Sequence, residues 1–217
     1  MTNNLDYQPE YRRNLPHIQP PGATLFITPR LAGSLPPEAL QRLRDERILR
    51  EKAIEEMTAP DEVKRQLLYD EDKRIFGRFD ALLDQAAYGP TWLGDPRVAA
   101  LVCEAIHHRD GRMYVLEAYC VMPNHIHVVA TPLERADGVY HALSKIMHGL
   151  KGYTAWEANN ILGREGAFWQ HESYDHYARD GRETERIIAY VLNNPVKAGL
   201  AASWEEWPWL YGRGVAS

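Results

Sequence analysis

The chain has 217 residues, enough to bury a hydrophobic core, and its length favours one domain over two. It shows no apolar run near the roughly 18 residues of a membrane span and no charged-then-apolar leader, so we expect a cytoplasmic protein that binds no membrane. Cys103 and Cys120 lie among apolar neighbours, which predicts buried, reduced thiols and disfavours a disulfide or a metal site. The net charge of −5 argues mildly against nucleic acid, because phosphate binding favours a basic surface.

The first part of the chain combines a proline-rich arm, one strand and a highly charged stretch. Four prolines among residues 1–22 predict an extended arm on the surface. The segment ATLFITPRL, residues 23–31, indicates a first strand. Two stretches between residues 38 and 86 have helical periodicity with many opposite charges four residues apart. We interpret them as solvated helices inserted, at about 38–86, into a single domain that spans 1–217.

The second half alternates predicted helices and strands. They are expected at residues 95–108 (helix), 113–122 and 125–133 (strands), about 138–159 (helix), 167–178 (strand) and after Asp180 (helix). Pro123 and Asn124 separate the paired strands as a short turn, which predicts an antiparallel hairpin. The order strand, helices, hairpin, helix, strand, helix predicts an α+β sandwich, a central antiparallel sheet with helices packed on it.

The segment VMPNHIHVVA, residues 121–130, places two histidines in a strand that otherwise reads as buried and β-branched. Side chains alternate across a strand, so His125 and His127 share one face with Cα atoms roughly 6.5–7 Å apart. Two imidazoles at that separation can bind one divalent ion. An H-x-H pair also fits two histidines on a solvent face, or two hydrogen-bonded core histidines, so the pair alone does not predict a metal site.

The last predicted helix has clear boundaries. Asp180 and Glu183 have the spacing of a capping box, which begins the helix near Gly181. Pro195 and Gly199 indicate its end.

The two sides of this helix differ in chemistry. Aliphatic residues cluster on the side expected to face the core, at Ile187, Ile188, Val191 and Leu192. Polar residues lie on the opposite side, at Glu183, Arg186, Tyr190, Asn193 and Asn194. An exposed helical tyrosine is common, yet Tyr, Asn and Arg together supply the parts of a phosphoryl-transfer site, namely a nucleophile, an amide for a metal and a cation for phosphate.

Four motifs carry a resemblance to a known family. They are, in chain order, VMPNHIHVVATP, LKGYTA, FWQHESYDHYARD and YVLNNPVKAGL. Together they resemble the REP-associated tyrosine transposases, a branch of the single-tyrosine HUH endonuclease superfamily. The resemblance covers roughly residues 112–200, and ATLFITPRL is similar to the family's opening strand. It implies a ferredoxin-like core in which the H-x-H strand is central and the tyrosine helix packs beside it.

The resemblance also implies roles for individual residues. His125 and His127 match the metal-binding histidines, Tyr190 matches the nucleophile, and Asn194 matches the position of a third polar metal ligand. It implies Mg²⁺ or Mn²⁺ as cofactor, although two histidines by themselves suit Zn²⁺ or Mn²⁺ better. The implied reaction is nicking and strand transfer on single-stranded or hairpin DNA, such as a REP-like repeat, through a 5′-phosphotyrosine. Tyr153, in LKGYTA, is the next candidate nucleophile.

A local basic groove can bind phosphates although the net charge of the chain is negative. Cations recur between Lys145 and Arg186, whereas much of the acid lies in residues 45–72. We expect the DNA contacts at Arg186, Lys151, Arg179, His176 and Lys197. Trp169, Tyr174 and Tyr177 either stack on unpaired bases or belong to the core.

Two alternatives remain open. A domesticated transposase would keep the fold and recognise a hairpin without cutting it. A metallohydrolase with H-x-H on a strand is the weaker alternative. Barrel hydrolases need a longer chain, and cupin-type sites need a further Glu and His at strand spacing, which this sequence does not show. The active form is expected to be a monomer or a homodimer.

Overall fold

The computed structural model describes residues 6–12, 16–136 and 138–215. The chain divides into two compact units, one formed by residues 1–32 and 91–217 and the other by residues 33–90. The single domain predicted from length stays a prediction, and each unit is described by itself.

The larger unit is built on a five-stranded antiparallel sheet. Its strands are β3 (Leu25–Thr28), β4 (Tyr114–Val121), β5 (Ile126–Pro132), β8 (Tyr174–Tyr177) and β9 (Leu210–Gly212). They lie in the order β8-β3-β5-β4-β9, and every neighbouring pair is antiparallel. The H-x-H strand β5 is therefore central, as expected.

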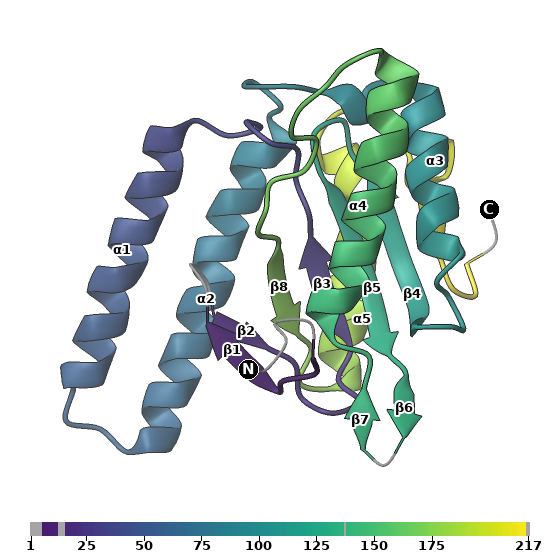
Figure 1. Cartoon of the computed structure of the whole chain (residues 1–217). Coiled ribbons are helices and arrows are strands. Elements are labelled where there is room, and N and C mark those ends of the chain that lie inside the picture. The colour runs from purple at the N-terminus through teal and green to yellow at the C-terminus, as the bar shows by residue number, and fades with distance from the viewer. Residues whose placement is uncertain (1–5, 13–15, 137, 216–217) are drawn as a thin grey trace. The chain divides into compact units, whose positions relative to one another are not determined.

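Three long helices cover this sheet. They are α3 (Pro96–His107), α4 (Leu143–Leu162) and α5 (Gly181–Lys197). Figure 1 shows α3 and α4 in front of the sheet and α5 behind it. The chain order β3-α3-β4-β5-α4-β8 is the β-α-β-β-α-β pattern of ferredoxin-like folds. The predicted α+β sandwich is confirmed.

Two helix starts follow the signals in the sequence. The Asp95 carboxylate accepts a hydrogen bond from Arg97 N at 2.9 Å, which caps α3. Asp180 Oδ1 accepts from Glu183 N at 2.8 Å, and Glu183 Oε2 accepts from Arg179 N at 2.9 Å. Asp180 is thus the N-cap of α5 as predicted, and the Glu183 side chain reaches back to the residue before the cap, which is a variant of the capping box.

The alternation of side chains gives the sheet two different faces. Leu25, Ile27, Leu116 and Val128 point to the side of α3 and α4, where they join the main hydrophobic core. Phe26 and His127 point to the other side, where α5 contacts β4 and β5. One face is therefore a conventional apolar core, and the other places polar side chains under α5.

Several boundaries differ from the predictions. A two-stranded ribbon, β6 (Glu134–Ala136) and β7 (Val139–Tyr140), delays α4 to Leu143 instead of about 138. Only Tyr174–Tyr177 of the expected strand 167–178 is regular. The 3-10 turns η1 (Trp92–Gly94) and η2 (Trp204–Glu206) and strand β9 were not predicted.

The N-terminal arm is more structured than predicted. Its described residues include a small hairpin, β1 (Glu10–Arg12) and β2 (Pro16–Ile18). His17 and Gln19 are buried, with 4% and 2% of their surface exposed. Residues 1–5 and 13–15 of the expected arm lie outside the described residues.

The smaller unit is a helical hairpin. It contains α1 (Pro37–Glu56) and α2 (Asp61–Asp84), which agree with the two predicted charged helices. Arg47 Nη2 on α1 donates to Asp72 Oδ1 on α2 at 2.7 Å, and Arg74 Nη2 donates to Glu46 Oε1 at 2.7 Å. Ion pairs between the helices thus explain the charge pattern of this stretch.

The described residues include no helix that is both long and apolar enough to cross a membrane. Cys103 and Cys120 form no disulfide, and Cys120 is buried as predicted, whereas Cys103 is only half-buried. Burial raises the pKa of the Cys103 thiol to about 11, which keeps it protonated at neutral pH.

Candidate active site

The two histidines meet on the α5 side of the sheet. His127 lies on β5 and His125 directly precedes that strand. Both side chains are fully buried, and the two Nε2 atoms are 3.0 Å apart. The solvent-face interpretation is therefore wrong. A divalent ion binds imidazole nitrogen at about 2.0–2.2 Å, so these nitrogens are close enough to share one ion.

The other ring nitrogens are held by neighbours that orient the imidazoles. His125 Nδ1 lies 2.7 Å from Asn124 Oδ1, and because an amide oxygen only accepts, Nδ1 is the donor. His127 Nδ1 lies 3.0 Å from the Thr28 hydroxyl oxygen, which is able to accept in the same way. In the tautomer in which both Nδ1 atoms donate, both Nε2 atoms carry a lone pair, and a cation between them removes the repulsion of two lone pairs only 3.0 Å apart. In the other tautomer of His127, its Nε2 donates to His125 Nε2. The donor set therefore fits a divalent metal ion.

Both imidazoles are neutral at physiological pH. Burial lowers the pKa of His125 to about 3, and the nearby charge of Lys197 adds to the effect. Burial, the neighbouring His125 and Lys197 lower the pKa of His127 well below its ordinary value. Only a neutral imidazole can donate a lone pair to a metal, so this environment favours metal binding.

Tyr190 of α5 lies against this histidine pair. Its ring makes edge contacts with His127, at 6.0 Å between centroids, and with Phe26, at 6.2 Å. The ring is half-buried, so the prediction that Tyr190 faces away from the sheet was wrong. The structure brings the predicted nucleophile next to one of the predicted metal ligands.

The burial of α5 explains this difference. Glu183 and Asn194, expected on the solvent side, are 4% and 0% exposed. Val191 is fully buried as predicted, whereas Ile187 and Leu192 are only half-buried. The sheet under α5 carries polar histidines, so the face of α5 that packs on it is polar as well. The prediction of the buried face from aliphatic periodicity alone was therefore wrong.

Asn194 lies one helical turn after Tyr190. Its side chain is completely buried, and among the described residues neither amide atom has a hydrogen-bond partner. A buried amide without partners is costly. Because Asn194 lies on the face of α5 that packs on the sheet, its amide oxygen remains a candidate ligand for a cation.

Lys197 completes the row on α5. Its Nζ donates to the Tyr190 hydroxyl at 3.3 Å and lies 5.1 Å from the ring centroid. Its charge also lowers the pKa of both histidines, which places it near all three groups. Lys197 was predicted as a DNA contact, and its position beside the tyrosine oxygen was not foreseen. The seven-residue spacing from Tyr190 was the available signal.

A family model described as "Transposase IS200 like" matches residues 95–194. This segment contains both histidines, Tyr190 and Asn194. The chain is therefore similar to IS200-like transposases over these residues, which make up just under half of its length.

Two further comparisons found similar proteins. A Haemophilus influenzae protein described as "Putative REP-associated tyrosine transposase" is 27% identical over 97 residues, which cover 42% of this chain and 55% of that protein. The chain thus spans about half the length of this curated relative. A solved structure described as a REP-associated tyrosine transposase bound to a REP hairpin aligns with a TM-score of 0.48 at 16% identity, covering 93% of this chain and 81% of that one. The resemblance to the REP-associated tyrosine transposases is confirmed.

The predicted DNA contacts fall into two places. Arg186 is exposed on α5 one turn before Tyr190, and Arg179 is exposed just before the helix. His176 on β8 pairs with Phe26, so it lies on the α5 side of the sheet, with its Nε2 3.7 Å from Glu183 Oε1. His176 thus lies on the same side of the sheet as the histidine pair, and the two arginines lie on or directly before the helix that carries Tyr190.

Lys151 lies elsewhere. It belongs to α4, which covers the opposite face of the sheet, and its Nζ donates to the carbonyl oxygens of Gln170 at 2.6 Å and His171 at 2.7 Å. Tyr153, the second candidate nucleophile, is exposed on the same helix. The structure brings neither residue to the histidine pair.

The orienting residues Asn124 and Thr28 were not predicted. Asn124 was read only as part of a turn, although an Asn directly before a ligand histidine is a usable signal. Thr28 comes from β3, roughly 100 residues earlier in the chain, so only the sheet register reveals it. Trp169, a candidate for base stacking, is 7% exposed and donates from Nε1 to Thr154 Oγ1 at 2.9 Å. It belongs to the core.

Proposed function

We propose that the protein is a metal-dependent enzyme that nicks single-stranded or hairpin-forming DNA and transfers the strand through a 5′-phosphotyrosine. One observation carries the proposal. The Tyr190 hydroxyl lies beside the Lys197 ammonium group, and the Tyr190 ring contacts His127 of a converging histidine pair. A nucleophile, a cation and a metal-ligand pair thus meet at one place.

The chemistry follows from these groups. The Tyr190 oxygen attacks the phosphorus atom of a phosphodiester and loses its proton to solvent water. The bond from phosphorus to the 3′ oxygen breaks, and that oxygen takes a proton from water to become a free 3′-hydroxyl. The new 5′-phosphotyrosine bond keeps the energy of the phosphodiester, so a 3′-hydroxyl can later rejoin the strand without ATP.

His125, His127 and Asn194 would hold the metal ion. We propose Mg²⁺ or Mn²⁺ in function, and Zn²⁺ is a competing occupant of a site with two imidazoles. A bound divalent ion supplies Lewis-acid polarisation of the phosphate and neutralises developing charge. Asn124 and Thr28 orient the two imidazoles.

The substrate class rests on charge and on the family. Lys197 lies beside the Tyr190 hydroxyl, Arg186 is exposed on the same helix and Arg179 just before it, and these cations suit a phosphate backbone. The curated relative is described as a REP-associated tyrosine transposase, and REP-like hairpins are accordingly the proposed targets.

The test is covalent capture of DNA. Labelled hairpin DNA is incubated with the protein and Mn²⁺, and products are separated on a denaturing gel. Wild type should form a protein–DNA adduct that chelation of the metal prevents. Tyr190→Phe should form none, while Tyr153→Phe, which removes a hydroxyl on the other side of the sheet, should behave as wild type.

A different outcome would favour a binding module. If wild type shifts hairpins on a native gel but yields no adduct across hairpins drawn from the host's own repeats, the proposal of nicking fails. If Tyr153→Phe abolishes the adduct and Tyr190→Phe retains it, the nucleophile is Tyr153 and the proposed role of Tyr190 is wrong.

A further inference from the structure

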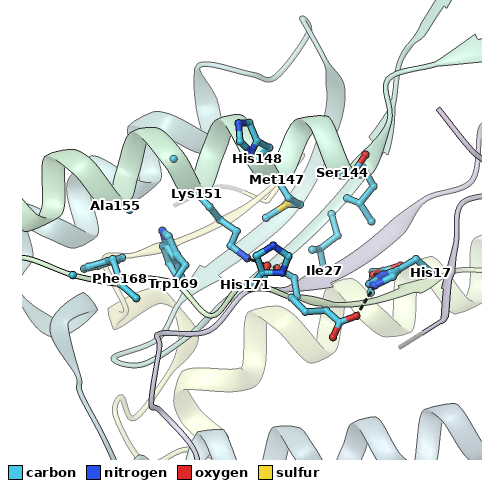
Figure 2. A pocket seen from close by; sticks show the side chains of 17 residues that line it. His17, Ile27, Ser144, Met147, His148, Lys151, Ala155, Phe168, Trp169 and His171 are labelled. Carbon is cyan, nitrogen blue, oxygen red and sulfur yellow. Dashed lines mark hydrogen bonds and ion pairs between the residues drawn. The ribbon is translucent and has the colours of Figure 1, made fainter. Parts of the chain in front are cut away.

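A second pocket lies on the side of the sheet opposite the histidine pair. It has a volume of about 390 Å³ and is formed by α4, the segment 166–175 and the sheet residue Ile27. Figure 2 shows Met147 and His148 of α4 on one side of it and His17 at one end. Its volume falls in the range of small-ligand sites, and the proposed reaction at Tyr190 makes no use of it.

One end of this pocket contains two buried carboxylates. His17 is held between two carboxylates, with Nδ1 bonded to Asp175 and Nε2 3.1 Å from Glu172 Oε1. Burial alone would lower the pKa of His17, but its hydrogen bonds to Asp175 and Glu172 raise that pKa to about 9. The imidazole is therefore charged at neutral pH and fixes the Asp175 carboxylate in place.

The second carboxylate oxygen of Asp175 is not used by the contact with His17. The Asp175 side chain is 2% exposed, and Oδ2 has no hydrogen-bond partner among the described residues. Asp175 pairs with Ile27 in the sheet, so its side chain points to the α4 side, where both residues line the pocket. A buried acceptor without a partner is costly unless a ligand supplies an N–H donor.

The remaining walls suit a flat, apolar ring. Met147, Phe168 and Trp169 line the pocket. The Trp169 ring is fixed by its hydrogen bond to Thr154. The exposed side chains of His148 and His171 lie at the pocket, beside the Lys151 ammonium group. Apolar walls, one anionic acceptor and basic groups at the opening match the ring, the amino edge and the phosphate of a nucleotide.

We propose that this pocket binds one unpaired nucleobase of the DNA strand and selects adenine, cytosine or guanine over thymine. The exocyclic amine of the base donates to Asp175 Oδ2. Thymine has no such amine, and its single ring N–H lies between two carbonyl oxygens that a carboxylate repels. The proposal rests on the proposed function for its DNA, yet it concerns recognition and not the reaction at Tyr190.

Two glycines of α4 provide a matched pair of variants. Gly152 lines the pocket, and a Cβ added there would meet nothing within 4 Å. Gly149 is also exposed on α4 but does not line the pocket, and a Cβ there would meet only the end of the Arg109 side chain at 3.7 Å. Gly152→Leu therefore obstructs the pocket, whereas Gly149→Leu adds the same side chain outside it.

The experiment measures affinity for hairpins with a single-stranded flank of thymines. One thymine at a time is replaced by adenine, cytosine or guanine. At one flank position, wild type and Gly149→Leu should bind the replaced hairpins roughly tenfold more tightly than the all-thymine hairpin, the scale of one base-specific contact. Gly152→Leu and Asp175→Asn should lose this preference and bind all of these hairpins with one common affinity.

Each other outcome overturns the proposal. The proposal is contradicted if wild type binds all hairpins equally, if Gly152→Leu keeps the preference for adenine, cytosine or guanine, or if no DNA is bound. Tighter binding of free dAMP than of the hairpin would instead make the pocket a small-molecule site. Adduct formation on the same hairpins is scored separately. A base preference without an adduct would refute nicking alone, and an adduct with a flat profile would refute the pocket alone.

Discussion

At the scale of single residues, Asn194 places an amide without a hydrogen-bond partner in a fully buried position. A residue selected for stability alone would be apolar there. We predict that Asn194→Leu stabilises the metal-free protein by about 1–3 kcal/mol, the cost of an unsatisfied buried polar group. The same change should weaken the stabilisation that Mn²⁺ gives to the wild type. Urea unfolding with and without Mn²⁺ measures both effects.

The neighbouring Asn193 is the control, because it is exposed on the same helix. Asn193→Leu should change neither the metal-free stability nor the response to Mn²⁺. Destabilisation of the metal-free protein by Asn194→Leu, with an unchanged response to Mn²⁺, would show that Asn194 serves packing and not a metal.

Lys197 and Arg186 flank Tyr190 on α5 and should differ in their kinetic roles. Lys197 Nζ donates to the Tyr190 hydroxyl, whereas Arg186 is exposed one turn away. Lys197→Met should lower kcat for nicking on the order of 100-fold, the effect of removing one preorganised charge-stabilising donor, with partial rescue by Lys197→Arg. Arg186→Met should mainly raise KM. Equal effects of both changes on KM alone would make Lys197 an ordinary phosphate contact.

At the scale of elements, His17 joins the N-terminal strand β2 to β8 through Asp175. The pKa of His17 rises from 6.5 to about 9 on folding, so the folded chain binds this proton more tightly. Its contribution is complete below pH 6.5 and is lost as pH rises through 9. The stability difference between wild type and His17→Gln should therefore shrink by roughly 3 kcal/mol over that interval.

Urea unfolding at several pH values measures this difference. His108→Gln, at an exposed histidine that ends α3, controls for the loss of any imidazole. A pH-independent difference between wild type and His17→Gln would mean that the contact stabilises the arm without a charged imidazole.

Elements with local signals were predictable from the sequence, and those fixed by distant partners were not. The N-caps Asp180 and Asp95 begin their helices where expected. The rotation of α5 was missed, because the hydrophobic pattern assumes an apolar floor and the sheet beneath it contains His125 and His127. Strand β9 pairs with β4 across roughly 90 residues of chain, and nothing local to residues 210–212 indicates it.

The site itself was predictable as a set of residue types and not as an assembly. The H-x-H spacing places two imidazoles on one face of a strand whatever the rest of the fold does. That Tyr190 reaches this face depends on how α5 packs on the sheet. The contact between His17 and Asp175 joins positions 158 residues apart, so the local sequence around either residue does not predict it.

At the scale of the whole molecule, residues 33–90 are inserted into the chain of the larger unit, and the residues of that unit on either side of the insertion lie close together. Leu31 N donates to Asn124 O at 2.9 Å, and Leu93 N donates to Pro123 O at 3.1 Å. The two acceptors belong to consecutive residues, so the chain leaves and re-enters the larger unit at nearly the same place. An insertion with adjacent ends can be removed without stretching the unit that carries it.

We therefore predict that a linker of roughly four to six Gly and Ser residues between Ala32 and Thr91 leaves a folded protein. The larger unit has its own core from the sheet, α3 and α4, so it should keep helical circular dichroism and cooperative urea unfolding. Adduct formation by the shortened protein then reports whether the hairpin of charged helices takes part in nicking. An aggregated product without a cooperative transition would instead support the single cooperative domain predicted from chain length, because the core of the larger unit would then need residues 33–90 to fold.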